Sequence, residues 1–129
     1  GWLPPETMDF VAYYLGMPPV AVYEVATFYA MYNRQPVGRY KITICTNLPC
    51  ALQDAVKSAE YLKAKLGIGF GETTPDGLIT LREGECMGAC GDAPVLLVNN
   101  KRMCSWMHPD KLDALIAELR AAGAGSGTP

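Results

Sequence analysis

The sequence predicts an α+β fold in which a short helical region precedes a small mixed sheet with helices on its faces. Two observations carry this prediction. Apolar residues recur at helical spacing in residues 1–37. From residue 38 onward, strand-like and helix-like segments follow in the order strand–helix–strand–strand–strand–helix. The first strand–helix–strand part predicts a parallel crossover, and the hairpin after it is antiparallel.

A cluster of chain-breaking residues, NRQPVG at 33–38, marks the boundary between the two parts. We therefore expect an N-terminal helical region at 1–37, the sheet domain at 38–122 and a flexible tail at 123–129. The first residue is Gly1 rather than Met, so we also expect that the natural chain begins earlier.

Two helices are predicted before the boundary. PPETMDFVAYYLG begins with prolines and stops at Gly16, and PPVAVYEVATFYAMY begins at Pro18 and Pro19. Helices this short and apolar cannot bury themselves, so they must pack on something else. We expect most of their aromatic residues to be core. The polar and aromatic face is also a candidate docking surface, through Trp2, Tyr13, Tyr14, Tyr29 and Tyr32.

The sheet domain opens with the alternating strand RYKITIC, which places Tyr40, Ile42 and Ile44 on one face. A helix capped by Thr46 or Asn47 is then expected to run through CALQDAVKSAEYLKAKLG to Gly67. Its predicted buried stripe consists of Leu52, Val56, Ala59, Leu62 and Leu66.

GLITL predicts the next strand, and VLLV and RMCSWM form a hairpin around the turn NNK. A last helix begins at Pro109, with Leu112, Leu115, Ile116 and Leu119 on its buried face. This order of elements resembles a thioredoxin-like fold.

Composition excludes several classes of function. Net charge is −2 with no basic block, which argues against a nucleic-acid partner. No apolar run approaches the ~18 residues of a membrane span, so we expect no direct membrane insertion. No signal peptide is visible, so the default compartment is reducing, where clustered cysteines bind metal or carry out redox chemistry.

Four of the five cysteines form two tight pairs. Cys45 and Cys50 have the spacing C-x4-C, 35 residues follow, and Cys86 and Cys90 have the spacing C-x3-C. Each pair follows a predicted strand, so the four thiols can converge. The position of Cys50 at a helix start, with Cys45 close by, is expected to favour the thiolate form.

Residue patterns alone leave four interpretations of these cysteines open. Disulfides need an oxidising compartment, and a thiol oxidoreductase calls for C-x-x-C. A structural zinc site and an iron–sulfur cluster both accept four thiolates in tetrahedral geometry. Small and apolar neighbours such as Gly88, Ala89 and Leu48 favour the cluster, because they admit N–H bonds to sulfur and exclude water.

Longer motifs resemble a known family. VYEVATFY, VGRYKITICTNLPC, KLGIGFGETTPDG and GECMGACGDAP are similar to segments of the thioredoxin-like [2Fe–2S] subunit of bacterial respiratory complex I, the NuoE family of NADH:quinone oxidoreductase. The resemblance covers about residues 2–120. It implies one [2Fe–2S] cluster with Cys45, Cys50, Cys86 and Cys90 as ligands, and a role as an electron relay without a complete active site.

The resemblance also implies partners and a location. FMN and NADH would be bound by a flavoprotein subunit, within the peripheral arm of complex I. The place would be the cytoplasmic side of the bacterial inner membrane, or the matrix side in mitochondria. Related subunits serve NAD-reducing hydrogenases and NAD-dependent formate dehydrogenases, and from the residues alone a structural zinc module remains the alternative of another class.

The remaining candidates receive plainer interpretations. Cys104 is expected to be a small buried hydrophobe, His108 a helix-entry residue, and GIGFG a helix ending rather than a phosphate loop. Three carboxylates, Glu83, Glu85 and Asp92, flank the second cysteine pair and would disfavour reduction of an anionic cluster.

Overall fold

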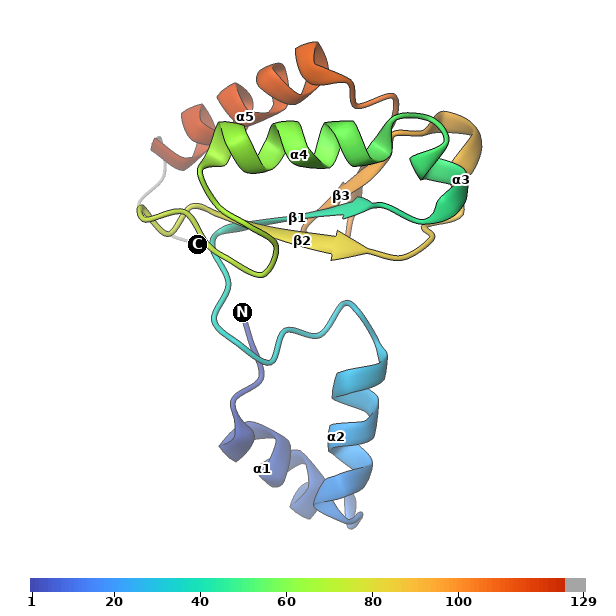
Figure 1. Ribbon diagram of the computed structural model, residues 1–129. Helices are drawn as coiled ribbons and strands as arrows, with labels where there is room; N and C mark the ends of the chain where they lie inside the picture. The colour runs from blue at the N-terminus through green and yellow to red at the C-terminus, as the bar shows by residue number, and fades with distance from the viewer. Residues whose placement is uncertain (125–129) are drawn as a thin grey trace. The chain divides into compact units, whose positions relative to one another are not determined.

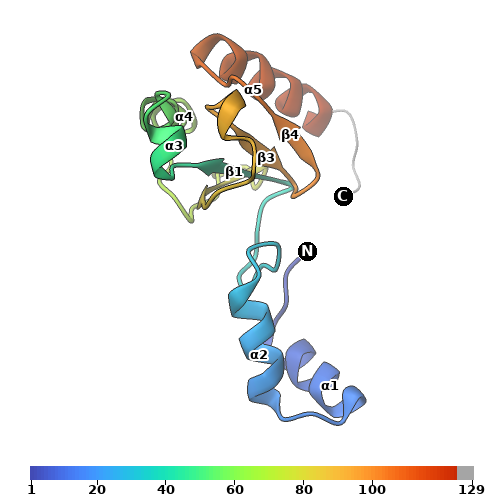
Figure 2. The same ribbon diagram turned by 90° about the vertical axis from the view of Figure 1, so that its right-hand side faces the viewer.

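A computed structural model describes residues 1–124 of the chain, so the part of the predicted tail at 125–129 lies outside the described residues. The chain divides into two compact units, Gly1–Val37 and the remainder from Gly38 onward. Figure 1 labels the helices and the first three strands, and Figure 2 labels β4.

The N-terminal unit consists of helices α1 (Pro5–Leu15) and α2 (Pro19–Phe28). Each has proline in its first turn, where the missing N–H costs nothing. Gly16 ends α1 in the left-handed conformation, as its position predicts. Helix α2 ends four residues earlier than the sequence pattern suggests. Tyr29 is already extended, so it does not continue the apolar stripe of α2.

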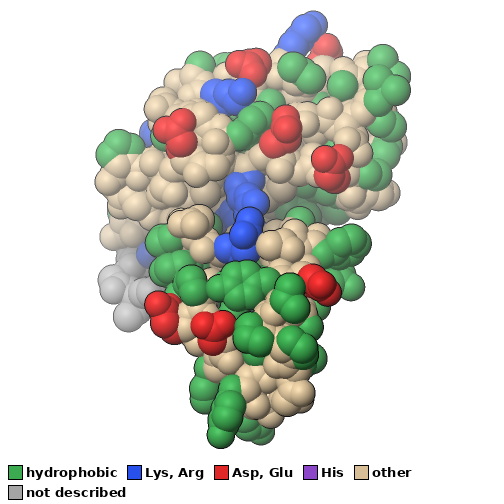
Figure 3. Space-filling model, turned by 60° about the horizontal axis from the view of Figure 1, so that its bottom comes forward, with side chains coloured by type: hydrophobic (Ala, Val, Ile, Leu, Met, Phe, Trp, Pro, Cys, Tyr) green, Lys and Arg blue, Asp and Glu red, His purple; other side chains and the backbone are tan. Residues whose placement is uncertain are grey.

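The expectation that most aromatic residues of this unit are core is wrong. Only Met8, Ala12 and Ala26 are buried in residues 1–37. Tyr13, Tyr14 and Phe28 are each more than three-quarters exposed. The reason is that two short helices share one narrow seam, and the side chains on their other faces have no facing element within the unit. Figure 3 shows hydrophobic side chains spread over the surface of this unit.

The second unit is built on a four-stranded mixed sheet in the order β2-β1-β3-β4. Strands β1 (Tyr40–Cys45) and β2 (Ile79–Gly84) are parallel, with Tyr40 opposite Ile79 and Cys45 opposite Gly84. Strands β3 (Leu96–Val98) and β4 (Arg102–Cys104) form an antiparallel hairpin, and β3 also pairs antiparallel with β1. The predicted crossover and hairpin are confirmed.

Helices α4 (Ala55–Leu66) and α5 (Pro109–Ala124) cover the same face of the sheet, as Figures 1 and 2 show. The strands turn alternate residues toward them, so Ile42, Ile44 and Leu81 are fully buried beneath the helices. The four predicted apolar residues of α5 are all buried in this core: Leu112, Leu115, Ile116 and Leu119.

The helix expected to continue from Cys50 to Gly67 is instead two helices. The one-turn helix α3 (Leu48–Ala51) is separated from α4, and Asp54 between them has φ +66°. This left-handed residue shifts the buried face of the second helix. Consequently Leu52 and Val56 of the predicted stripe are exposed, while Ala59, Leu62 and Leu66 are buried as expected.

The β3–β4 turn and the end of α5 complete this unit. Asn99 and Asn100 both have positive φ in the β3–β4 turn, the conformation that such tight hairpins require. Helix α5 runs through residues 123 and 124, which the sequence assigned to the tail. In this last turn the Gly123 carbonyl accepts a hydrogen bond of 3.5 Å from Arg39, and Gly123 lies so close to the Leu78 side chain that an added Cβ would force that side chain to move.

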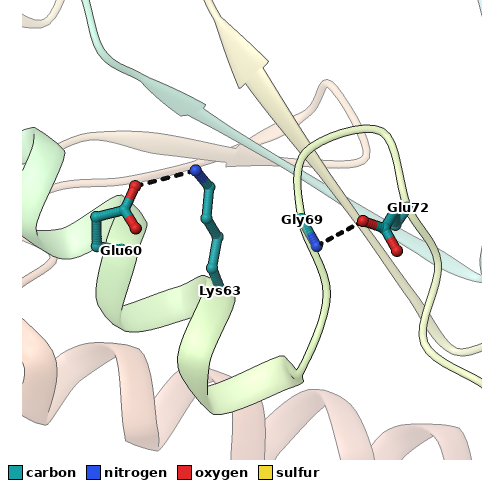
Figure 4. A network of polar contacts seen from close by, with 4 residues as sticks. All are labelled: Glu60, Lys63, Gly69 and Glu72. Atoms are coloured by element: carbon teal, nitrogen blue, oxygen red, sulfur yellow. Dashed lines mark hydrogen bonds and ion pairs between the residues drawn. The ribbon is translucent and has the colours of Figure 1, made fainter.

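Figure 4 shows two short polar contacts, one within α4 and one in the loop that follows it. Lys63 forms an ion pair with Glu60 at 3.0 Å and lies 4.2 Å from the centre of the Phe70 ring. The N–H of Gly69 donates to the Glu72 carboxylate at 3.1 Å. None of the helices within residues 1–124 is long and apolar enough to cross a membrane.

The corrected helix phase can be tested by paired substitutions in the predicted stripe. Leu62 is fully buried and Leu52 is three-quarters exposed. We expect Leu62→Ala to lower the free energy of unfolding by about 2–5 kcal/mol, and Leu52→Ala by less than about 0.5 kcal/mol. Urea unfolding followed by far-ultraviolet circular dichroism measures both. Equal losses would mean that the uninterrupted helix is correct.

Candidate metal centre

The four paired cysteines lie at one end of the sheet. Cys45 is the last residue of β1, and Cys50 lies in α3, the first turn of the crossover that follows. Cys86 comes two residues after the end of β2, and Cys90 begins the single turn of 3-10 helix η1 (Cys90–Asp92). Parallel strands end at the same edge, so α3 and the loop after β2 lie at the same end of the sheet in Figure 1.

Cys45 and Cys50 form an inner pair that water does not reach. Both side chains are almost completely buried, in a small apolar cluster with Ala55, Ala93 and Val95. Burial raises the pKa of the Cys50 thiol to about 12, and contact with the thiols of Cys45 and then Cys90 adds to the effect. A buried thiolate here therefore requires a cation beside it.

The prediction that the helix start favours the thiolate form of Cys50 is therefore wrong for the protein without bound metal. Partial charges at a helix N-terminus favour a thiolate. Helix α3 has only one turn, however, and the pKa of Cys50 is raised rather than lowered because burial dominates. The apolar surroundings of the thiol thus outweigh its position in the sequence.

Cys86 and Cys90 form an outer pair with sulfurs 3.6 Å apart. The N–H of Gly88 donates to the Cys86 sulfur at 3.4 Å, and this bond, with a further one from Cys90, lowers the pKa of Cys86. The hydrogen bond with Cys86 raises the pKa of Cys90. Gly88 has φ +75°, so glycine suits the turn that aims this N–H at sulfur.

The two pairs are in contact through Cys50, whose thiol interacts with both Cys45 and Cys90. They meet as pairs and not as a closed cage. Within residues 1–124, no three Cys, His, Asp or Glu side chains are grouped as a ready-made site for one ion.

The other candidates lie apart from this arrangement. Cys104 is on β4, at the opposite edge of the sheet from β2, packed against the main core. The carbonyl of His108 accepts the first hydrogen bond of α5, as expected of a helix-entry residue. In GIGFG the Gly69 N–H already donates to a carboxylate, which disfavours an anionic phosphate there.

The carboxylates near the outer pair differ in their surroundings. Glu83 and Glu85 are exposed, whereas Asp92 accepts a hydrogen bond of 3.4 Å from the Ser105 hydroxyl. The contact of residues 105–107 with the loop of Cys90 is a feature that the sequence does not reveal. Most of this contact consists of hydrogen bonds between backbone atoms, so no pattern of residue types in the sequence predicts it.

Comparisons with known proteins agree with this geometry. A family model described as thioredoxin-like [2Fe–2S] ferredoxin matches residues 1–120. NADH-quinone oxidoreductase subunit 2 of Thermus thermophilus is 41% identical over 121 residues, covering 94% of this chain and 67% of that protein. An NADH-quinone oxidoreductase subunit of Rickettsia conorii is 46% identical over 120 residues, covering 93% of this chain and 71% of that protein.

The fold is also found in a solved structure. The crystal structure of an NAD⁺-reducing [NiFe]-hydrogenase in the air-oxidized state has a TM-score of 0.77 over 91% of this chain and 20% of that chain, at 23% identity. At this identity the likeness concerns the fold alone. Together, the sheet topology, the match of the family model and the identities above confirm the predicted thioredoxin-like fold and the resemblance. The chain belongs to the family of thioredoxin-like [2Fe–2S] ferredoxins that includes these NADH-quinone oxidoreductase subunits.

Proposed function

We propose that this chain is an electron-transfer subunit of an NADH-quinone oxidoreductase and binds one [2Fe–2S] cluster. The ligands are Cys45, Cys50, Cys86 and Cys90. The observation that carries the proposal is the meeting of two cysteine pairs at the shared end of two parallel strands, in a chain of this family. When bound, the cluster supplies a one-electron redox couple.

The donor set suits such a cluster. Tetrahedral metal–thiolate bonds of about 2.3 Å place two sulfurs on one metal about 3.8 Å apart. Cys86 and Cys90 are 3.6 Å apart, so they can share one iron without a change in the loop. Cys45 and Cys50 are in contact with each other and can share the second iron. Binding displaces the thiol protons, so the raised pKa of Cys50 makes uptake depend on pH.

The protein around the cysteines supplies burial and hydrogen bonds. Ala55, Ala93 and Val95 exclude water from the inner pair. The Gly88 N–H stabilises negative charge on the Cys86 sulfur, one of the means by which proteins adjust the potential of a cluster. Of the outer pair, Cys86 is exposed and Cys90 is partly exposed, so this is the side of the site that a redox partner can approach.

Electrons would come from a partner flavoprotein subunit that binds FMN and NADH. The proposed docking surface is formed by exposed aromatic residues of the N-terminal unit, two on α1 and three outside its helices: Tyr13 and Tyr14, and Trp2, Tyr29 and Tyr32. Aromatic residues are enriched in protein interfaces because they bury a large area at a low cost in conformational entropy. The subunit would then lie on the cytoplasmic side of the bacterial inner membrane, or in the mitochondrial matrix, held through its partners.

A diaphorase subunit of an NAD-reducing hydrogenase is the second candidate, because that assembly contains the same fold. No observation favours the third assignment, a subunit of an NAD-dependent formate dehydrogenase. Identity of 41–46% to the NADH-quinone oxidoreductase subunits, against 23% to the hydrogenase, favours the respiratory assembly.

Metal content is the first test. After anaerobic purification we expect about two irons and two sulfides per chain, and a paramagnetic resonance signal that appears only after reduction with dithionite. Zinc is redox-silent and gives no such signal. A colourless protein with one zinc per chain would leave a structural metal site and remove the electron-transfer role.

Single substitutions test the ligand set. We expect Cys45→Ser, Cys50→Ser, Cys86→Ser and Cys90→Ser each to lose most of the bound iron, because each removes one thiolate ligand. Cys104→Ser is the matched control and should keep wild-type iron content, since Cys104 lies at the other edge of the sheet. Iron and sulfide assays measure the outcome. Iron loss confined to one pair would mean that the other two cysteines are not ligands.

The docking surface is tested in the assembled complex. We expect the triple variant Trp2→Ser, Tyr13→Ser and Tyr14→Ser to reduce co-purification of the flavoprotein subunit at least about tenfold, because exposed aromatics anchor interfaces. Met103→Gln, an exposed apolar residue on β4, is the control. Full recovery of the partner with the triple variant would move the interface elsewhere.

A further inference from the structure

The turn between β4 and α5 holds the loop that carries Cys90. The N–H of Trp106 donates to the carbonyl of Asp92 at 2.8 Å, and the N–H of Met107 donates to the carbonyl of Pro94 at 2.8 Å. Asp92 is the last residue of η1, which begins at Cys90. These two bonds therefore fix the chain immediately after an outer cysteine.

Trp106 has a backbone conformation that its side chain does not explain. Its φ of +52° lies in the left-handed region, which a bulky residue rarely adopts. The ring is half exposed, with the Lys111 ammonium 5.5 Å from its centre, so burial of the ring does not compensate. Such outliers persist where the surrounding structure enforces them, and they gather at functional sites.

The unusual conformation has a geometric consequence. In an extended strand, successive N–H groups point to opposite sides, so a continuation of β4 would offer only one of two neighbouring donors to the loop. A left-handed residue turns successive N–H groups toward the same side. Here it directs the donors of residues 106 and 107 together at residues 92 and 94.

The turn is itself anchored in the sheet domain. The Met107 side chain is almost completely buried in the main hydrophobic core, among residues of the sheet and α5. The Ser105 hydroxyl adds a bond of 3.4 Å to the Asp92 carboxylate. The loop of Cys90 is therefore tied to the rigid part of the unit through residues 105–107.

We propose that Trp106 is a positioning residue for Cys90, and that it acts through its backbone and not through its ring. It fixes the loop after Cys90 and thereby sets how firmly the outer thiol pair holds the cluster. This inference rests on the proposed function, because it concerns retention of that cluster.

Three variants of the full chain separate backbone from ring. Trp106→Val keeps the N–H but strongly disfavours positive φ, whereas Trp106→Gly removes the ring and relaxes the backbone. Asn100→Val is the matched control, because Asn100 has φ +61° at the opposite end of the same strand. The measurement is the rate of iron release from the reconstituted protein to a chelator, without oxygen.

We expect Trp106→Val to release iron at least about tenfold faster than the wild type, as for other residues that orient metal ligands. Trp106→Gly should release it no faster than the wild type, and Asn100→Val should stay within about twofold. Wild-type release from a folded Trp106→Val variant would overturn the proposal. So would release from Trp106→Gly as fast as from Trp106→Val, which would assign the role to the ring.

Hydrogen exchange of the Met107 amide in cluster-free protein is a second measurement. Protection should persist in Trp106→Gly and fall in Trp106→Val, and equal protection in both would overturn the proposal. Should the valine variant not fold, the glycine variant decides alone, since faster iron release or lost protection contradicts a backbone role. A wild-type protein that takes up no cluster removes the proposed function, while the exchange comparison still tests the anchoring.

Discussion

The parallel pairing of β1 with β2 is the constraint on which the rest of the site depends. Parallel strands finish at the same edge, and the register that sets Cys45 opposite Gly84 brings the start of the second cysteine loop beside the end of the first strand. A parallel pair also requires a crossover, and the first turn of that crossover carries Cys50. One topological feature therefore delivers both cysteine pairs to one place.

Burial gives the two pairs different physical roles. The inner thiols are surrounded by apolar side chains, so negative charge on them is costly unless a metal cation compensates it. The outer thiols meet solvent, and the Gly88 N–H stabilises charge there. Cluster binding should thus contribute to folding chiefly through the inner pair, while the outer loop needs mechanical anchoring because little of it is buried. The turn after β4 provides that anchoring.

Local patterns predicted most of the sheet domain. Alternation predicted β1, the asparagine turn predicted the hairpin, and helical spacing predicted α5, because in each case a short stretch of sequence decides the structure. The helix through Cys50 was predicted wrongly, since the left-handed Asp54 interrupts a pattern that looks continuous. Cysteine spacing and strand ends predicted the candidate site, but the cofactor came from the resemblance. The hydrogen bonds from residues 106 and 107 were not predicted, because they join backbone atoms of two separate segments and do not depend on residue type.

The two units differ in how far they bury their own apolar side chains. The sheet domain closes a core of its own beneath α4 and α5, whereas the helical unit buries only three side chains and leaves its aromatics in solvent. Two helices of this length have little stability in isolation. At the proposed docking surface a partner would supply the apolar contacts that the unit lacks, and the order of the two helices would then be coupled to binding. An electron relay works only beside its donor, so the proposed completion of the helical unit by a partner would suit this function.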